Sequence, residues 1–155
     1  VVDSSQADFM ERLIAAVDET GARLAFDAIG GGTMASQILT AMETVAARGM
    51  AYSRYGSNQK KKVYVYGALD TGPTIVTRSF GFTWEVAGWL LTPFLFSLPP
   101  DEVPKLRARA AARLTTTFAS RFKAKVGLEE MLTREAALAY NARATGEKYL
   151  LTPNG

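Results

Sequence analysis

The sequence predicts an α/β protein with a doubly wound, mostly parallel sheet. Two apolar segments predict strands that each run into glycine, at Gly30-Gly31-Gly32 and at Gly67. A helical pattern follows the first of them, and β-α-β units in series give parallel strands with right-handed connections. Ligands of such sheets bind outside the carboxyl ends of the strands, so both glycine ends should share one rim.

Composition excludes several classes of chemistry. The 155 residues suit one hydrophobic core and contain neither cysteine nor histidine. Disulfides, Cys/His zinc sites, His-based triads and thiol nucleophiles are therefore absent from this chain. The lack of cysteine fits a cytoplasmic protein. The first residues lack a signal-peptide pattern, and Trp84 to Leu98 is too short to span a bilayer, so no membrane partner is expected.

The first helix and the organising strand come next. Ser4 or Ser5 should cap a helix with apolar side chains at helical spacing, and Gly21 should end it. Ala22 to Ile29 is almost continuously apolar, which predicts a strand buried on both faces. Asp27 is its one charged member, and its carboxylate should accept hydrogen bonds from neighbouring backbone N–H groups.

A second helix and strand follow. Thr33 should cap a helix that ends at Gly49, and Lys62 to Tyr66 predicts the next strand. Lys60-Lys61-Lys62 is the only dense basic run. A lysine run just before a strand indicates a solvated edge rather than a nucleic-acid site.

The remaining elements are predicted from shorter patterns. Residues 71–82 should form a loop or a short extended piece, followed by a strand in Thr83 to Leu91 and a short helix from Thr92 to Leu98. A long helix should start at Pro99-Pro100-Asp101. The apolar side chains of this helix should be buried, namely Val103, Leu106, Ala110, Leu114 and Phe118. Its basic side chains should be solvated, namely Lys105, Arg107, Arg109 and Arg113.

The last part should be strand, helix and strand. Arg121 to Val126 alternates like an exposed strand. A helix capped by Thr133 should run to Ala144 and end at Gly146, before a final strand at Lys148 to Leu151.

The three glycines match a nucleotide-binding pattern only in part. Gly30 to Ala35 reads G-x-G-x-x-A between a strand and a helix, but the fingerprint needs an acidic residue about 20 residues further on. Asp70, the nearest acid at the end of the next strand, is too far along. A pyrophosphate loop, a plain structural turn and a glycine edge facing another part of a cofactor all remain open. The chain has no P-loop or catalytic triad, so it looks like a holder of a cofactor.

These motifs, in this order, resemble the medium-chain dehydrogenase/reductase superfamily, and most closely its NADPH:quinone oxidoreductase-like branch, also described as zinc-containing alcohol dehydrogenase-like. The matching segments are Asp27 to Gly31, Tyr66 to Ala68 and Ala144 to Pro153. The resemblance implies the C-terminal part of such a protein, a partial Rossmann fold with a C-terminal return segment. Residues 1–120 would form the second half of the nucleotide-binding domain, and residues 121–155 the return segment.

The resemblance also implies a site. Gly30 and Gly31 would lie beside NADPH, while Gly67, Ala68 and Leu69 would line the nicotinamide pocket. Gly88, Trp89 and Leu90 would form a further strand end there. The implied reaction is hydride transfer from NADPH to a quinone or an activated alkene or carbonyl. Catalytic or metal-binding residues would lie in a preceding part, so this chain alone would be inactive.

The resemblance further implies a homodimer through Thr83 to Leu91, because such enzymes often pair their sheets along that edge strand. Two other functions compete with a cofactor-binding one. The first is a non-catalytic Rossmann-like interaction or dimerisation module. The second, a basic nucleic-acid binder, ranks last.

Overall fold

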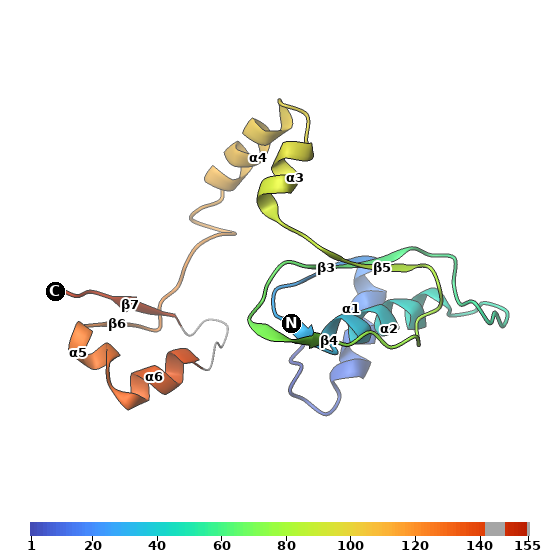
Figure 1. Ribbon diagram of the computed structural model, residues 1–155, viewed down its shortest axis with the longest axis horizontal. Coiled ribbons are helices and arrows are strands. Elements are labelled where there is room, and N and C mark those ends of the chain that lie inside the picture. Colours follow the sequence, from blue (N-terminus) through green and yellow to red (C-terminus); the bar gives the residue numbers. More distant parts are fainter. Residues whose placement is uncertain (142–147, 155) are drawn as a thin grey trace. The chain divides into compact units, whose positions relative to one another are not determined.

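The computed structural model describes residues 1–141 and 148–154, and the chain divides into two compact units, Val1–Ser97 and Leu98–Gly155. Each unit is described by itself (Figure 1). The elements of the first unit are, in order, α1 (Phe9–Thr20), β1 (Leu24–Asp27), β2 (Gly30–Gly32), α2 (Met34–Ala46), β3 (Lys61–Val65), β4 (Asp70–Thr74), β5 (Trp84–Gly88) and α3 (Leu91–Ser97). Those of the second are α4 (Glu102–Ala111), β6 (Ala124–Val126), α5 (Leu128–Met131), α6 (Arg134–Asn141) and β7 (Tyr149–Leu151).

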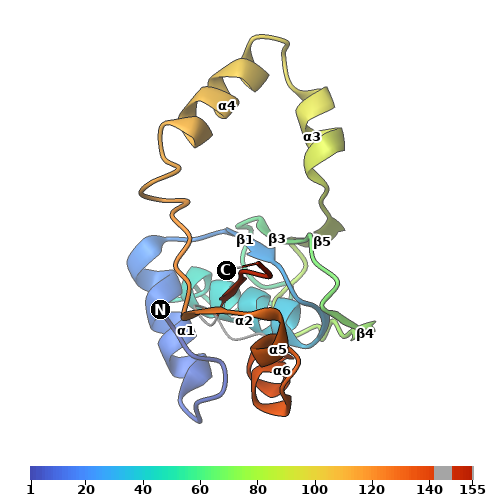
Figure 2. The ribbon, with the colours of Figure 1, turned by 90° about the vertical axis from the view of Figure 1, so that its left-hand side faces the viewer.

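The sheet of the first unit is parallel, as predicted. Its strands lie in the order β1-β3-β5, and Figure 2 shows them next to one another. Asp27 pairs with Val65, and Val65 pairs with Gly88, so the three strands reach their carboxyl ends at the same level. A second, two-stranded parallel ladder joins β2 to β4.

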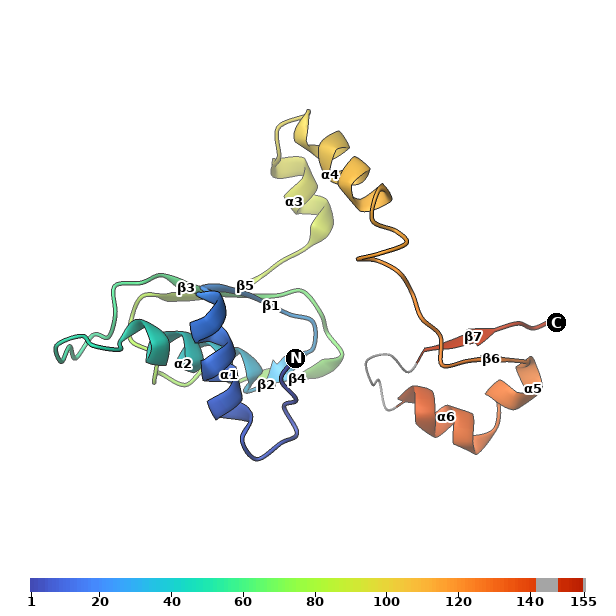
Figure 3. The ribbon, with the colours of Figure 1, turned by 180° about the vertical axis from the view of Figure 1, so that it is seen from behind.

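The core of this unit lies between the sheet and two helices. Figure 3 shows α1 and α2 on one face of the sheet and α3 leaving from the other. Leu39 on α2, Val63 on β3 and Phe80 in the loop between β4 and β5 are completely buried there. The spacing of apolar residues in the two helices predicted which helix faces would be buried against the sheet.

The other face of the sheet is open, so the predicted burial of the first strand on both faces is wrong. Leu24 and Phe26 are about half exposed. Their side chains point away from α1 and α2, and no second helical layer covers them within this unit. A continuous apolar run indicates that a strand is suited to burial on both faces. It does not show that a helix packs on the second face.

The helix termini agree with the sequence in part. Gly21 adopts a left-handed conformation, with φ of 62°, and ends α1 as predicted. Ser4 and Ser5 do not cap that helix, because the backbone N–H and the hydroxyl of Ser5 both donate to the Asp3 carboxylate, and the N-cap is Asp8. Thr33 is the N-cap of α2, without a capping hydrogen bond from its side chain.

The second unit contains the predicted strand–helix–strand. β6 and β7 pair in parallel, with α5 and α6 between them in sequence. The long helix is shorter than predicted, since α4 ends at Ala111. Its predicted apolar side is not buried either: α4 contains no buried residue, and Leu114 and Phe118 beyond it are exposed. Only turns follow α4, so these two side chains never join an apolar helix face.

Three expectations about chain organisation have different outcomes. The predicted helix end at Ala144 and Gly146 lies outside the described residues. The division into parts at residue 120 stays a prediction. Within the described ranges, no helix has the length and apolar character needed to cross a bilayer.

Candidate functional site

The two glycine ends meet, as the parallel register requires. A Cβ atom on Gly30 would lie 2.9 Å from the carbonyl oxygen of Gly67, and one on Gly67 would lie 1.6 Å from the carbonyl oxygen of Ala28. The carboxyl ends of β1 and β3 therefore touch through their backbones. Glycine is needed at both positions for the chain to pack against itself.

The three glycines form strand β2, whereas a turn was one of the three possibilities that the sequence left open. The backbone N–H of Asp70 donates to the carbonyl of Ile29 at 2.9 Å, and that of Ile75 donates to Gly32 at 2.8 Å. The Asp70 carboxylate occupies the side-chain position of Gly31, where a Cβ would lie 2.4 Å from Asp70 Cγ. Here the missing side chain makes room for a neighbouring carboxylate.

Asp27 holds the end of β1 in shape. Its Oδ1 accepts hydrogen bonds from the backbone N–H of Ile29 at 2.8 Å and of Gly30 at 3.1 Å, which confirms the expected role. Oδ2 is buried and has no hydrogen-bond partner among the residues that the structure describes. The side chain thus fixes the approach of the chain to the first glycine.

A shallow, open hollow of about 530 Å³ lies beyond the carboxyl ends of β3 and β5. Five of the eight residues predicted for the cofactor site line it, namely Gly67, Ala68, Gly88, Trp89 and Leu90. The other lining residues are Val65, Tyr66 and Pro93. Gly30 adjoins this hollow through its contact with Gly67. Gly31 and Leu69 do not line it, and Leu69 is about half exposed.

Aromatic side chains cover the open face of the sheet beside this hollow. Ring centroids of Phe26 and Trp89 lie 5.9 Å apart, those of Phe26 and Tyr64 5.5 Å, and those of Trp89 and Phe94 5.5 Å. Together with Tyr66 they form a surface that we call the aromatic face, and a groove of about 710 Å³ runs over it. Phe26 and Tyr64 lie on strands and Phe94 lies on α3, and no pattern in the sequence shows that these rings stay uncovered.

The opposite ends of the strands carry a buried ionic network that the sequence did not predict. Lys61 is completely buried, contrary to the expected solvated edge, and its ammonium donates to Glu43 Oε2 at 2.5 Å and to Ser57 Oγ at 3.1 Å. The hydroxyl and the backbone N–H of Ser57 also donate to Glu43. Burial alone would raise the pKa of Glu43, but the hydrogen bonds from Lys61 and Ser57 outweigh it and hold the pKa below its usual value.

The other two lysines of the run stay at the surface. Lys62 Nζ lies 2.7 Å from the Glu85 carboxylate and 4.2 Å from the centre of the Tyr64 ring, and Lys60 lies 3.4 Å from Glu85. The hydrogen bond from Lys62 lowers the pKa of Glu85. The run therefore divides into one buried and two surface lysines.

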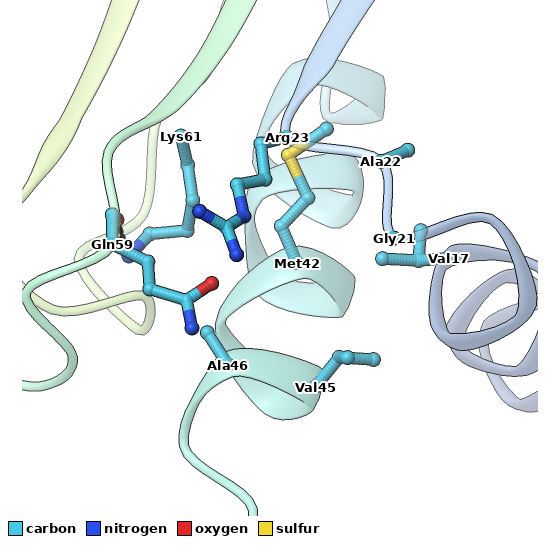
Figure 4. A pocket seen from close by; sticks show the side chains of 9 residues that line it. All are labelled: Val17, Gly21, Ala22, Arg23, Met42, Val45, Ala46, Gln59 and Lys61. Carbon is cyan, nitrogen blue, oxygen red and sulfur yellow. Dashed lines mark hydrogen bonds between the residues drawn. The ribbon is translucent and has the colours of Figure 1, made fainter.

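Figure 4 shows Lys61 with Arg23 and Gln59 around a smaller cavity of about 150 Å³, between the last turns of α1 and α2. This cavity lies at the amino ends of β1 and β3, away from the glycine rim. Among the described residues, no group of three or more Asp and Glu side chains is placed to hold a metal ion.

The comparisons with known proteins support the fold. No family model and no curated protein matches the sequence. A candidate NADPH:quinone reductase of known structure from Mesorhizobium loti matches 97% of this chain with a TM-score of 0.59 and 20% identity. A mutant enoyl thioester reductase from Candida tropicalis matches 95% with a TM-score of 0.47 and 17% identity.

This chain spans only 39% and 37% of those two proteins. At such low identity the first likeness shows a shared fold. The predicted α/β class, a partial Rossmann-like fold with parallel strands, is therefore confirmed, and it is the fold that the resemblance to medium-chain dehydrogenases/reductases implies.

Proposed function

We propose that this chain is the cofactor-binding part of an NADPH-dependent oxidoreductase that transfers hydride to a quinone or an activated alkene or carbonyl. The observation that carries the proposal is the hollow at the aligned carboxyl ends of parallel strands, bordered by Gly67, Gly88 and Trp89. Ligands of α/β sheets bind at this edge. The shared fold with a candidate NADPH:quinone reductase supports the choice of cofactor.

The lining of the hollow fits a flat, mostly apolar ring. Gly88 has open space where a side chain would be, and Trp89 and Leu90 supply apolar walls. In this proposal Gly67 and Ala68 lie on one side of the nicotinamide, with Gly88, Trp89 and Leu90 on the other, and Leu69 stands next to the hollow without lining it. Gly30 and Gly31 lie towards the ribose. Bound NADPH would supply the hydride, and these residues would orient its ring and exclude water.

Other parts of the catalytic machinery would come from outside these 155 residues. The chain by itself is proposed to be inactive, since no carboxylate or lysine side chain lines the hollow among the residues that the structure describes. β5 stands at one end of the strand order, so we propose that Thr83 to Leu91 pairs with a second copy to form a homodimer in the cytoplasm.

Titration with NADPH and NADH tests the proposal, with energy transfer from tryptophan to the reduced nicotinamide as the readout. We expect weak or no binding to this chain and clear binding to a protein extended at its N-terminus. In the longer protein, Gly88→Phe should fill the hollow and weaken binding at least about tenfold, a loss of about 1.4 kcal/mol. Gly127→Phe is the matched control, because its added side chain also enters open space.

A non-catalytic interaction module is the second candidate, favoured by the exposed aromatic face. If neither the short nor the extended protein binds a nicotinamide nucleotide, the oxidoreductase proposal fails and the interaction module replaces it. If Gly88→Phe and Gly127→Phe weaken nucleotide binding equally, the hollow is not the cofactor-binding site.

A further inference from the structure

The positive charge of this chain is concentrated in one stretch. Between Val103 and Leu128 there is no acidic residue, and there are seven basic ones, Lys105, Arg107, Arg109, Arg113, Arg121, Lys123 and Lys125. The rest of the chain has eleven basic and fifteen acidic residues and is therefore net negative. We call residues 103–128 the basic segment. Its charge is of one sign, unlike an ordinary solvated surface in which both signs alternate.

Most cations of the α4 region lack an intramolecular partner. Lys105 donates to Asp101 at 2.6 Å and to Glu102 at 2.8 Å, and these contacts raise its pKa. Within the described part of the chain, Arg107, Arg109 and Arg113 form no ion pair. Arg109 lies in the last turn of α4 and Arg113 in the turn that follows it, and both line the same hollow, where like charges repel. An anion from outside the chain would relieve that repulsion.

Large apolar side chains are exposed in the same segment. The exposed fraction is 62% for Leu114, 56% for Phe118 and 47% for Phe122. A hollow of about 270 Å³ lies between the apolar and the basic groups, lined by Leu106, Arg109, Ala110, Arg113, Thr117 and Phe118. The segment thus presents cations and uncovered apolar surface side by side.

We infer that the basic segment binds the surface of an anionic lipid bilayer. Its arginines and lysines meet the anionic headgroups, while Leu114, Phe118 and Phe122 enter the boundary between headgroups and acyl chains. The long arginine stems can lie along apolar surface with their charges among the headgroups. This is attachment to a membrane surface, and it revises the expectation of no membrane partner without adding a spanning helix.

The apolar groups decide between lipid and nucleic acid. A single-stranded nucleic acid would use the cations and could stack its bases on the phenylalanine rings. It would leave the aliphatic Leu106 and Leu114 in water, whereas a bilayer buries them. The inference rests only on the second unit and is independent of nicotinamide binding by the first.

Co-sedimentation of the 155-residue chain with vesicles tests the inference. We expect binding to phosphatidylcholine vesicles that contain phosphatidylserine, little binding to phosphatidylcholine alone, and a loss of binding as salt is raised. Arg109→Gln with Arg113→Gln should weaken the partition coefficient about fivefold for each cation removed. Arg12→Gln with Arg78→Gln removes the same charge from exposed positions outside the segment and should change little.

A second pair separates the apolar contribution from charge. Leu114→Ser with Phe118→Ser keeps all cations, alters two exposed side chains and should still weaken vesicle binding several-fold. Absence of binding to the anionic vesicles, or an equal effect of the two arginine pairs, overturns the inference. A combination of two results also overturns the inference. In it, Arg109→Gln/Arg113→Gln weakens binding of a single-stranded oligonucleotide, while Leu114→Ser/Phe118→Ser leaves vesicle binding unchanged.

Discussion

The ammonium of Lys61 lies 2.5 Å from Glu43 Oε2, and both side chains are buried between α2 and the start of β3. The pair joins residues that are eighteen positions apart in the sequence. Ser57 completes the network by donating its hydroxyl and its N–H to the same carboxylate. This network connects the loop before β3 to the helix that precedes it.

Removing one member of this pair should cost more stability than removing both. Lys61→Met or Glu43→Leu alone leaves the other buried group without its partner, and we expect the free energy of unfolding to fall by about 3–5 kcal/mol. Glu43→Leu with Lys61→Met should recover much of that loss, because a buried charge no longer remains. Urea unfolding of the four proteins gives the coupling energy. Additive single losses would contradict the pairing.

The stability of the protein should fall at acidic pH, in part through Glu43. The pKa of Glu43 is lowered in the folded protein, so the unfolded chain binds its proton more tightly. Stability then rises with pH in this range. The contribution is complete above the ordinary pKa of 4.5 and is lost as pH falls through the lower folded value. Urea unfolding at several pH values should show a shallower acid loss in Glu43→Gln, and an unchanged slope would contradict this.

Gly67 should not tolerate alanine. The added Cβ would meet the backbone of Ala28 at 1.6 Å, so we expect a loss of at least about 3 kcal/mol in the free energy of unfolding. Gly88→Ala is the matched control at the end of the neighbouring strand, where nothing lies within 4 Å of the new atom, and its effect should stay within about 0.5 kcal/mol. Similar losses in both proteins would mean that β1 and β3 do not touch at this rim.

Asp27 should contribute to stability through one oxygen. Asp27→Ala removes the acceptor of hydrogen bonds from the backbone N–H groups of Ile29 and Gly30, the second of which is buried. The free energy of unfolding should fall by about 2 kcal/mol or more. Asp27→Asn keeps an oxygen in the place of Oδ1 and should cost less, about 1 kcal/mol. Thermal unfolding distinguishes the two variants. Equal losses would show that the charge matters more than these hydrogen bonds.

The elements with strong periodicity were predictable from the sequence. The apolar spacing of residues 9–20 and 34–46, the strands around Val63 and Val86, and the stop at Gly21 follow from local patterns. Each of these signals is contained within one element. Their parallel arrangement follows from the connecting helix and the crossover rule.

Contacts between distant residues were not predictable. Lys61 looks like its two neighbours in the sequence, and only its contact with Glu43 explains its burial. β4 was predicted only as a loop or a short extended piece, because Asp70–Thr74 is polar and contains glycine and proline. Its pairing with β2 comes from the backbone of Gly30–Gly32. The sequence predicted Gly67 and Ala68 at a strand end, and the resemblance implied the same for Gly88, Trp89 and Leu90. The structure brings them to one hollow, while their role towards a cofactor stays a prediction.

The central position of β3 has a consequence for how the first unit opens. Its backbone is hydrogen-bonded on both sides, as the N–H of Lys62 donates to Arg23 and that of Lys61 donates to Thr83. β1 and β5 each have a strand on one side only within this sheet. In deuterated buffer, amide protons of Lys61 to Val65 should therefore be the last of the three strands to exchange, and those of β1 and β5 should be released earlier by local fraying.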